Sequence, residues 1–458
     1  MASTYLQKTL GTPTSQRIWT FSAWVKRSGI SSTQHIFSID NGSARDAFSF
    51  DSDNGLRLYF NSSASPYADL STNRVLKDTS AFYHLVIAVD TTQATADDRV
   101  KLYINGTQYT WDETTIDPAL NYYTFNASGN TFRIGRDRTS ANYFDGLMSY
   151  VAFVEGTQEL PTIFGETDAT TGEWKIKTTI TPTSGWGNNG FLILKDGNTI
   201  TDQSSNSNDF TLGGGTLTNT EDCPSNVFAT LNPLDLGDTT NIATLSNGNN
   251  YYSSTQGGYN MMVTTLGANS GKWYWEAKYI SHNMHGNSNN FGINPGFTGD
   301  RIPIGTTTSY LGKTANAYAF VDAGNVFNND TTTTYDSGAT TANNLNDIVG
   351  IALDLDNNKA YYHVNGTYWN SANPSNGTGG LSINPASQTE AGFYFPSISD
   401  KSSTRSYVYA FNFGNGYFGT TAVTTNSGNG YAGTDGASKF TYQPPTGYSA
   451  INTKGLNL

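Results

Sequence analysis

Aromatic side chains stand beside amides and carboxylates in several polar loops of this sequence. A sugar-binding site uses an exposed aromatic ring against the sugar face, with Asn or Asp side chains that bond hydroxyl groups. The candidates are Trp369 with Asn370 and Asn373, then Tyr335, Asp336, Trp111 and Tyr143. The alternative is that each ring after a turn packs on its cross-strand neighbour. These positions are therefore candidate ligand contacts with a structural alternative.

Residues typical of hydrolytic and metal centres lack the spacing that such chemistry needs. The histidines show no zinc-type spacing: His35, His84, His282, His285 and His363. No Gly-x-Ser-x-Gly elbow lies between a strand and a helix. The one cysteine, Cys223, allows neither an intramolecular disulfide nor a thiolate metal cluster. We therefore expect no catalytic residues and no certain cofactor.

The composition predicts short strands and tight turns. Aromatic residues make up 13% and charged residues 14% of 458 residues, and there are 47 glycines. Beta-branched and aromatic side chains suit pleated surfaces. The net charge of −12 disfavours a nucleic-acid partner, because an acidic surface repels phosphates. No segment resembles a signal peptide or a membrane span, so we expect a soluble protein made in a reducing cytosol and no membrane insertion.

The elements that must position these residues are strands. In "WTFSAWVK" Trp19, Phe21, Ala23 and Val25 alternate onto one face, and "FYHLVIAVD", "TFRIG" and "FDGLMSYVAFV" continue the series. Strands at this spacing predict an antiparallel sandwich. Residues 1–165 are therefore the first predicted domain.

Polar, glycine-rich sequence follows at 166–225, where "GFLILKDG" is the one clear strand. We expect an irregular bridge that packs partly on the first domain. Strands resume in 226–458, where "KWYWEAKY" and "SYVYAFNFG" each place aromatic residues on one face. The predicted fold class is thus all-β, with two antiparallel sandwich domains of jelly-roll type. Trp19, Trp273 and Trp275 are assigned to the cores.

Two segments share one pattern, "VKLYING" at 100–106 and "KAYYHVNG" at 359–366. Each follows an apolar strand that ends in Asp, and each ends in Asn-Gly, which favours a two-residue hairpin turn. The surrounding motifs differ. We therefore interpret the two segments as the same kind of hairpin in two different sandwiches, and not as a repeat. We expect the function to lie in the loops that differ between the two domains.

The first domain resembles the concanavalin A-like, laminin-G-like jelly rolls. The resemblance is carried by "WTFSAWVKRSG", "FYHLVIAVD", "VKLYINGTQ", "FRIGR" and "FDGLMSYVAFVEG". The second domain resembles a SPRY domain through "GKWYWEAKY", "IVGIALDLDNNKAYYHVNGT", "FYFPSIS" and "FNFG". The joints "DQSSNSNDFTL", "DCPSNVFATLNPLD" and "FTYQPPTGYSAINTKGL" resemble segments of virion proteins of tailed, especially marine, phages.

The resemblance implies two kinds of chemistry to test. Some jelly rolls of this type are glycosidases that carry Glu-x-Asp-x-Glu on one strand. The nearest segment here is "GETDATTGE", where the spacing does not place Glu166, Asp168 and Glu173 on one strand face. Related jelly rolls also hold Ca²⁺ at the rim with oxygen ligands. The candidates are Asp97, Asp98, Asp137 and Asp145, with bonding to their own turns as the alternative.

The function implied is that of a non-enzymatic virion protein on the particle surface, assembled in the cytoplasm of the bacterial host. It would serve as a fibre, spike or capsid decoration that binds host-surface glycan or neighbouring virion proteins. Two alternatives stay open, a purely structural cement protein and a polysaccharide hydrolase. Displayed phage proteins are often symmetric, so a homotrimer is a further open alternative.

Overall fold

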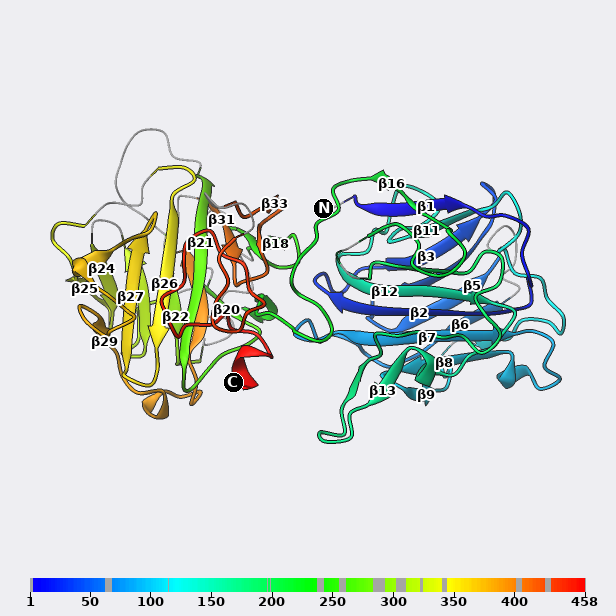
Figure 1. Cartoon of the computed structure of the whole chain (residues 1–458), viewed down its shortest axis with the longest axis horizontal. Coiled ribbons are helices and arrows are strands. Elements are labelled where there is room, and N and C mark those ends of the chain that lie inside the picture. Colours follow the sequence, from blue (N-terminus) through cyan, green and yellow to red (C-terminus); the bar gives the residue numbers. More distant parts are fainter. Residues whose placement is uncertain are drawn as a thin grey trace. The chain divides into compact units, whose positions relative to one another are not determined.

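The computed structural model describes residues 3–61, 68–113, 115–195, 197, 199–236, 243–254, 261–282, 293–301, 310–321, 324–339, 344–400, 406–424 and 430–457. The chain divides into two compact units, Met1–Asn219 and Thr220–Leu458. Each unit is built from antiparallel strands, and the fold class predicted from the sequence is confirmed (Figure 1).

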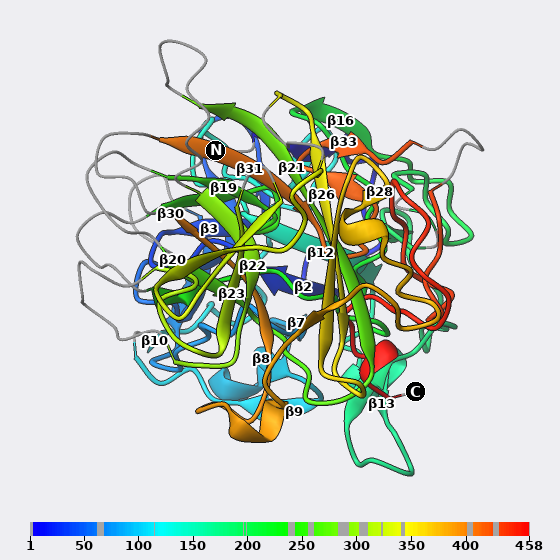
Figure 2. The same cartoon turned by 90° about the vertical axis from the view of Figure 1, so that its left-hand side faces the viewer.

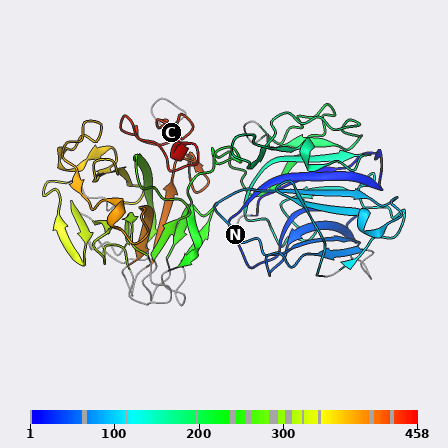
Figure 3. The ribbon, with the colours of Figure 1, turned by 90° about the horizontal axis from the view of Figure 1, so that it is seen from below.

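The first unit packs two sheets face to face (Figures 1 and 3). The larger sheet has the order β10 (Thr115–Ile116), β6 (Ala68–Ser71), β5 (Leu56–Phe60), β4 (Arg45–Phe50), β3 (Gln34–Asp40), β11 (Thr131–Ile134), β1 (Tyr5–Thr9) and β16 (Thr211–Gly214). The smaller sheet has the order β15 (Phe191–Ile193), β12 (Gly146–Glu155), β2 (Ile18–Arg27), β7 (Tyr83–Asp90), β8 (Val100–Ile104) and β9 (Thr107–Tyr109).

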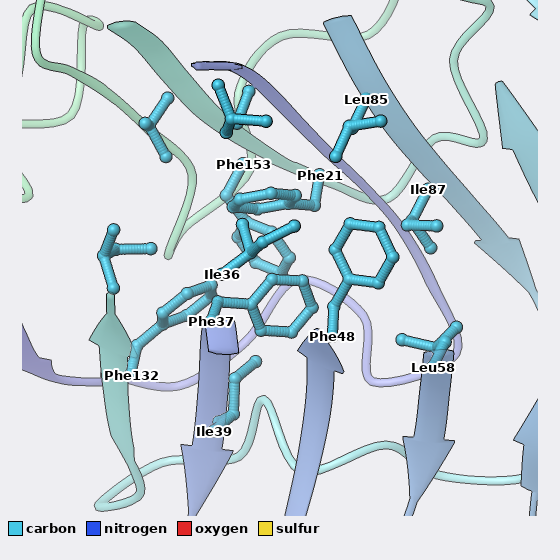
Figure 4. Close-up of a cluster of buried hydrophobic side chains, with 14 of the residues drawn as sticks. Phe21, Ile36, Phe37, Ile39, Phe48, Leu58, Leu85, Ile87, Phe132 and Phe153 are labelled. Atoms are coloured by element: carbon cyan, nitrogen blue, oxygen red, sulfur yellow. The ribbon is translucent and has the colours of Figure 1, made fainter. Parts of the chain in front are cut away.

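Alternation along these strands builds the core between the sheets. Phe21, Leu85 and Ile87 from the smaller sheet meet Phe48 and Leu58 from the larger one (Figure 4). Burial of such side chains stabilises the fold by about 1.5–3 kcal/mol each. The predicted inward face of β2 is confirmed, because its aromatic and aliphatic members are at most 1% exposed.

The predicted bridge, residues 166–225, contributes an edge strand to each sheet of the first unit. β15 pairs with β12, and β16 pairs with β1. Asp202 fixes the turn between them by accepting hydrogen bonds from the backbone N–H groups of Leu192 and Asn208 at 2.8 and 2.7 Å. A separate hairpin pairs β13 (Gly165–Thr167) with β14 (Trp174–Ile176).

The second unit also packs two sheets (Figure 2). One sheet has the order β17 (Leu231–Leu236), β20 (Met261–Thr264), β30 (Phe395–Asp400), β22 (Ile293–Thr298), β23 (Ala317–Val321), β24 (Asn325–Asn328) and β25 (Thr331–Thr334). The other has the order β18 (Thr244–Ser246), β19 (Tyr251–Ser253), β31 (Tyr407–Asn412), β21 (Lys272–His282), β26 (Ile348–Asp354), β27 (Lys359–Val364) and β28 (Thr367–Tyr368), with β29 (Leu381–Ser382) also on β27. A small hairpin joins β32 (Tyr417–Phe418) to β33 (Thr421–Ala422).

The two ends of the second unit are tied to each other. Phe228 pairs with Asn452, and the backbone N–H of Val227 donates to Oγ1 of Thr453 at 3.0 Å. The side chain of Asn226 accepts from the backbone N–H of Lys454 at 3.1 Å. The polar segments around 222 and 450 thus close the unit. The predicted core positions Trp273 and Trp275 are confirmed as buried.

The two Asn-Gly turns have the same geometry in both units. Asn105 and Asn365 each have a φ of 49°, and the following glycines have positive φ values of 78° and 86°, as a type I′ turn requires. Oδ1 of Asn105 accepts from the backbone N–H of His84 at 2.8 Å, and Oδ1 of Asn365 accepts from that of Ile348 at 2.9 Å. The side chain therefore ties each turn to the start of a neighbouring strand, β7 in the first unit and β26 in the second.

Helical structure in the described residues is confined to five short 3₁₀ turns: η1 (Ala96–Asp98), η2 (Pro161–Ile163), η3 (Trp369–Ser371), η4 (Ala386–Gln388) and η5 (Gly455–Asn457). None of the helical segments in these residues is long and apolar enough to cross a bilayer.

Candidate functional site

The structure brings together four of the predicted ligand residues at one rim of the second unit. Tyr335 and Asp336 follow β25, while Trp369 and Asn370 begin η3. The backbone N–H of Asn370 donates to Oδ2 of Asp336 at 2.6 Å. The hydroxyl of Tyr335 donates to the backbone oxygen of Gly379. Residues more than 30 apart in the sequence thus share one site.

Residues 370–380, here called the rim loop, are held at both ends by these contacts. The Nδ2 group of Asn370 also donates to the backbone oxygen of Gly379, at 3.1 Å. Asn370 and Gly379 have φ values of 57° and 73°, conformations that Asn and Gly tolerate best. Their residue types therefore suit the start and end of the loop.

The middle of the rim loop is also ordered. Asn373 and Thr378 exchange backbone hydrogen bonds of 3.0 and 3.2 Å. The ammonium group of Lys359 donates to the backbone oxygen of Gly377 at 2.5 Å, and the backbone N–H of Thr446 donates to Oγ of Ser375 at 3.0 Å. Asn373, Ser375, Asn376 and Thr378 are exposed. The loop therefore presents amides and hydroxyls on a fixed backbone.

The prediction that Trp369 presents an exposed ring is wrong. The side chain is 1% exposed and stacks on Phe320, with ring centroids 4.5 Å apart and an interplanar angle of 20°. A ring that follows an Asn-Gly hairpin lies over the adjacent strands and is drawn into their core. Trp369 therefore supports the rim loop from below and has no free face for a sugar.

The first-unit candidates Trp111 and Tyr143 contact different residues. Trp111 is half-buried against the core, and its Nε1 donates to the backbone oxygen of Val100 at 3.2 Å. Tyr143 is half-buried, with its ring centroid 6.2 Å from that of Tyr5. Arg136 lies beside both tyrosines. Neither candidate is an isolated, fully exposed ring.

Two of the four predicted calcium ligands have cationic partners. Asp137 forms an ion pair of 2.6 Å with Arg45, and Asp98 lies 3.4 Å from Lys101. Asp97 is exposed on η1, and burial raises the pKa of Asp145. Over the described ranges, no three His, Cys, Asp or Glu side chains are grouped to hold a metal ion. The partner of Asp137 is a cation, which argues against Ca²⁺ at that carboxylate.

The carboxylates considered for glycoside hydrolysis lie on the β13–β14 hairpin. Lys175 contacts Glu166 at 3.5 Å and Asp168 at 3.0 Å. The carboxylate of Asp168 also accepts from the backbone N–H groups of Thr171 and Thr170, and these bonds with Lys175 lower its pKa. A general acid needs a raised pKa, so Asp168 is suited to hold the turn and unsuited to donate a proton.

His84 and Ser22 form the hydrogen-bonded pair that most resembles a base and a nucleophile. The indole Nε1 of Trp174 donates to Nδ1 of His84 at 2.9 Å. Because indole only donates, the proton of neutral His84 is on Nε2, which donates to Oγ of Ser22 at 2.9 Å. Burial lowers the pKa of His84 to about 3. His84 therefore cannot take the proton of Ser22 in this arrangement.

A buried chain of polar groups occurs in the second unit. The backbone N–H of Gly366 donates to Nδ1 of His363 at 3.1 Å, so Nε2 donates to the hydroxyl of Tyr274 at 2.7 Å. That hydroxyl donates to Glu276 at 3.1 Å. Burial raises the pKa of Glu276 to about 7. The carboxylate also accepts from the backbone of Thr441 and Tyr442, which ties the C-terminal segment to β21. His285 and the side chain of His282 lie outside the described residues.

Sequence reasoning missed a cluster on the outer face of the larger sheet of the first unit. Arg45 and Arg57 flank the ring of Tyr59, with guanidinium carbons 5.1 and 5.6 Å from its centroid. The signal was present in "RDAFSF" and "LRLYF", where these residues alternate with core positions. These residues lie within strands β4 and β5 and outside the loops.

Comparisons with known proteins support the expected fold of the first unit. Residues 2–160 match the family model described as "Concanavalin A-like lectin/glucanases superfamily" (Laminin_G_3). This part of the chain has the concanavalin A-like lectin/glucanase fold, and the laminin-G-like resemblance is confirmed. No curated protein matches the sequence.

Among solved structures, the chain is similar to the SPRY domain of human HERC1, with a TM-score of 0.27, 16% identity, and coverage of 40% of this chain and 96% of that chain. It is also similar to stonustoxin, with a TM-score of 0.26, 18% identity, and coverage of 42% of this chain and 27% of that chain. A third similar structure is a heptameric SAP-like pentraxin from Limulus polyphemus, with a TM-score of 0.25, 19% identity, and coverage of 33% of this chain and 69% of that chain. These TM-scores are too low to assign a fold or a role to this chain.

Proposed function

We propose that this chain is a non-enzymatic protein of a tailed phage particle that binds glycans of the host surface. The carrying observation is the rim loop, fixed by the Asp336–Asn370 and Tyr335–Gly379 contacts. Binding costs less entropy when the contact groups are already ordered. Exposed amides and hydroxyls on a rigid loop are suited to bond sugar hydroxyls.

The rim-loop residues have separate roles in this proposal. Asp336 and Tyr335 hold the backbone, and Trp369 packs beneath it. Asn373 and Asn376 are the exposed contact groups. Loops on a rigid sandwich commonly carry binding function, and the sheets behind β25 and β27 supply that support.

The virion assignment rests on the joint segments, which resemble those of tailed-phage virion proteins. In this chain these segments close each unit, as the Asp202 turn and the Phe228–Asn452 pairing illustrate. The protein would be displayed on the particle surface as a fibre, spike or capsid decoration, in contact with other virion proteins. A purely structural cement role is the alternative.

Adsorption of the purified full-length chain to host cells tests the proposal. Fluorescently labelled chain should bind the cells, and isolated host-surface polysaccharide should compete with that binding. Immunogold labelling of intact particles should place the chain on their surface. Absence of cell binding, together with loss of particle stability when the gene is deleted, would favour the cement alternative.

A further inference from the structure

The outer face of the larger sheet in the first unit carries a continuous row of residues across five strands. Arg133 of β11 pairs with Ser38 of β3, which pairs with Ala47 of β4. Ala47 pairs with Tyr59 of β5, which pairs with Asp69 of β6. Small side chains thus separate Arg133 from the Tyr59 ring. Ser38 and Ala47 are both 0% exposed, so longer side chains of this face cover them.

Carboxylates fix the arginines of this face. Nε and Nη2 of Arg57 donate to the two oxygens of Asp69 at 2.8 and 2.7 Å, and Asp51 lies 3.6 Å from Nη1. Asp69 bonding is the largest cause of a raised pKa at Arg57. Arg45 is held by Asp137. Asp69 therefore occupies one edge of the Arg57 fork and holds the remaining N–H donors of that guanidinium group in one orientation.

Arginine is concentrated here although the protein is acidic. Of the 11 arginines in the chain, five lie on this face or on the loop that follows β11: Arg45, Arg57, Arg133, Arg136 and Arg138. Lys and Arg are interchangeable for simple charge, but only Arg offers a planar fork. On this face the forks of Arg45, Arg57 and Arg133 already meet the carboxylates of Asp137, Asp69 and Asp40.

The ion pair between Arg57 and Asp69 contributes little to the stability of the fold. The side chain of Arg57 is 40% exposed, and pairs that involve exposed charges contribute little to folding. Arg57 uses two of its five N–H donors on Asp69, and Tyr59 is half-buried beside it. Arg57 therefore offers exposed donors next to an aromatic ring, whereas the side chains of Arg45 and Arg133 are only 18% and 15% exposed.

We propose that this face, formed by Arg45, Arg57, Tyr59 and Arg133 with their carboxylates, binds an acidic polysaccharide. A sugar ring would lie beside Tyr59, and its carboxylate or sulfate group would meet the exposed guanidinium group of Arg57. The proposal rests on the glycan-binding function above. It adds a site in the first unit and the chemical class of its ligand.

Binding of the full-length chain to three polymers tests this inference. Polygalacturonate supplies carboxylates, dextran sulfate supplies sulfates, and dextran is neutral. One or both acidic polymers should bind, with affinity that falls as salt is raised, and dextran should bind at least about tenfold more weakly. The acidic polymer that binds identifies the acid group. Equal binding of all three polymers, or binding of none, overturns the inference.

Variants locate the site. Arg57→Gln should weaken binding of the acidic polymer by about tenfold or more. Arg74→Gln is the matched control, because Arg74 is also an exposed arginine of this unit over a tyrosine ring, 4.4 Å from the centroid of Tyr109. It should change affinity less than about twofold.

Arg57→Lys keeps the positive charge and removes the planar guanidinium group. This variant tests the role of Arg57 in binding if Arg57→Gln does not fold. It should also weaken binding, and unchanged affinity in a folded Arg57 variant overturns the inference. If the chain adsorbs to host cells while Arg57 variants and acidic polymers have no effect, the proposed function stands and this inference fails. If no host surface or polysaccharide binds, both fail.

Discussion

The backbone N–H of Asn370 donates to Oδ2 of Asp336 at 2.6 Å, across 34 residues of sequence. This bond joins the end of the β25 edge to the start of the rim loop. Hydrogen bonds to a charged acceptor contribute about 1.5–3 kcal/mol. The position of the exposed amides therefore depends on one carboxylate oxygen of Asp336 as well as on the sheets.

Replacing Asp336 by Ala should loosen the rim loop without unfolding the second unit. The Asn370 N–H loses its acceptor, so local opening of residues 370–379 should become easier by about 1–3 kcal/mol. Hydrogen exchange followed by mass spectrometry measures this. Asp330→Ala is the control, because Asp330 is an exposed aspartate of the same unit that accepts from the hydroxyl of Tyr310 at 2.6 Å. Equal exchange in the two variants would contradict the role given to Asp336.

Gly106→Ala should dislodge the β13–β14 hairpin. An added Cβ would lie 2.5 Å from the ring of Trp174, and the φ of Gly106 is +78°. Gly42→Ala is the control, since its φ is +87° with nothing within 4 Å of the added Cβ. Both variants carry a similar backbone strain. The clash should lower the free energy of unfolding by a further 1–3 kcal/mol or so, measured by urea denaturation, with faster proteolysis at 168–173. Equal stability of the two variants would show that Trp174 does not anchor the hairpin.

Acid should destabilise the first unit through His84. Its pKa is lowered to about 3 by burial, while that of an unfolded histidine is about 6.5. The neutral form therefore stabilises the fold fully above about pH 6.5, and this contribution is lost as the pH falls toward 3. His84→Phe keeps a ring between Trp24 and Trp174 and cannot be protonated.

The free energy of unfolding should be measured for both proteins from pH 7 to pH 4. The difference between wild type and His84→Phe should shrink as the pH falls, by about 1.4 kcal/mol per unit. Other groups, such as Glu276 with its raised pKa, titrate in both proteins and cancel in the difference. A difference that does not vary with pH would mean that His84 is not buried as a neutral ring.

Alanine at both Glu166 and Asp168 should leave glycan binding unchanged. Their contacts are with Lys175 and with the hairpin turn. Incubation of the wild type with host polysaccharide should release no reducing ends above a heat-treated control. Release that the double variant abolishes would establish the hydrolase alternative instead.

The strands could be predicted from the sequence because one face of each sheet is buried. Alternation in "WTFSAWVK" and "KWYWEAKY" identified Trp19, Trp273 and Trp275 as core residues, and all three are at most 5% exposed. The Asn-Gly turns were also predictable, because positive φ at two successive residues strongly restricts residue type.

The site was only partly predictable. Tyr335 and Asp336 lie beside Asn370, as the prediction of one site requires. Trp369 is buried, because the strands beside it offer an apolar surface on which its ring stacks. The composition of the loop does not show that surface. Arg57 and Tyr59 were missed because a strand residue on the outer face meets its partners through sheet register. Register of Tyr59 with Asp69 and Ala47 depends on pairings that a single sequence does not state.

The most direct test measures binding of the purified full-length chain to polysaccharide isolated from the host surface. Biolayer interferometry on immobilised polysaccharide should show saturable binding by the wild type. Asp336→Ala should bind about tenfold or more weakly, and Asp330→Ala should bind like the wild type. No binding by the wild type to host polysaccharide or to intact host cells would contradict the proposed function.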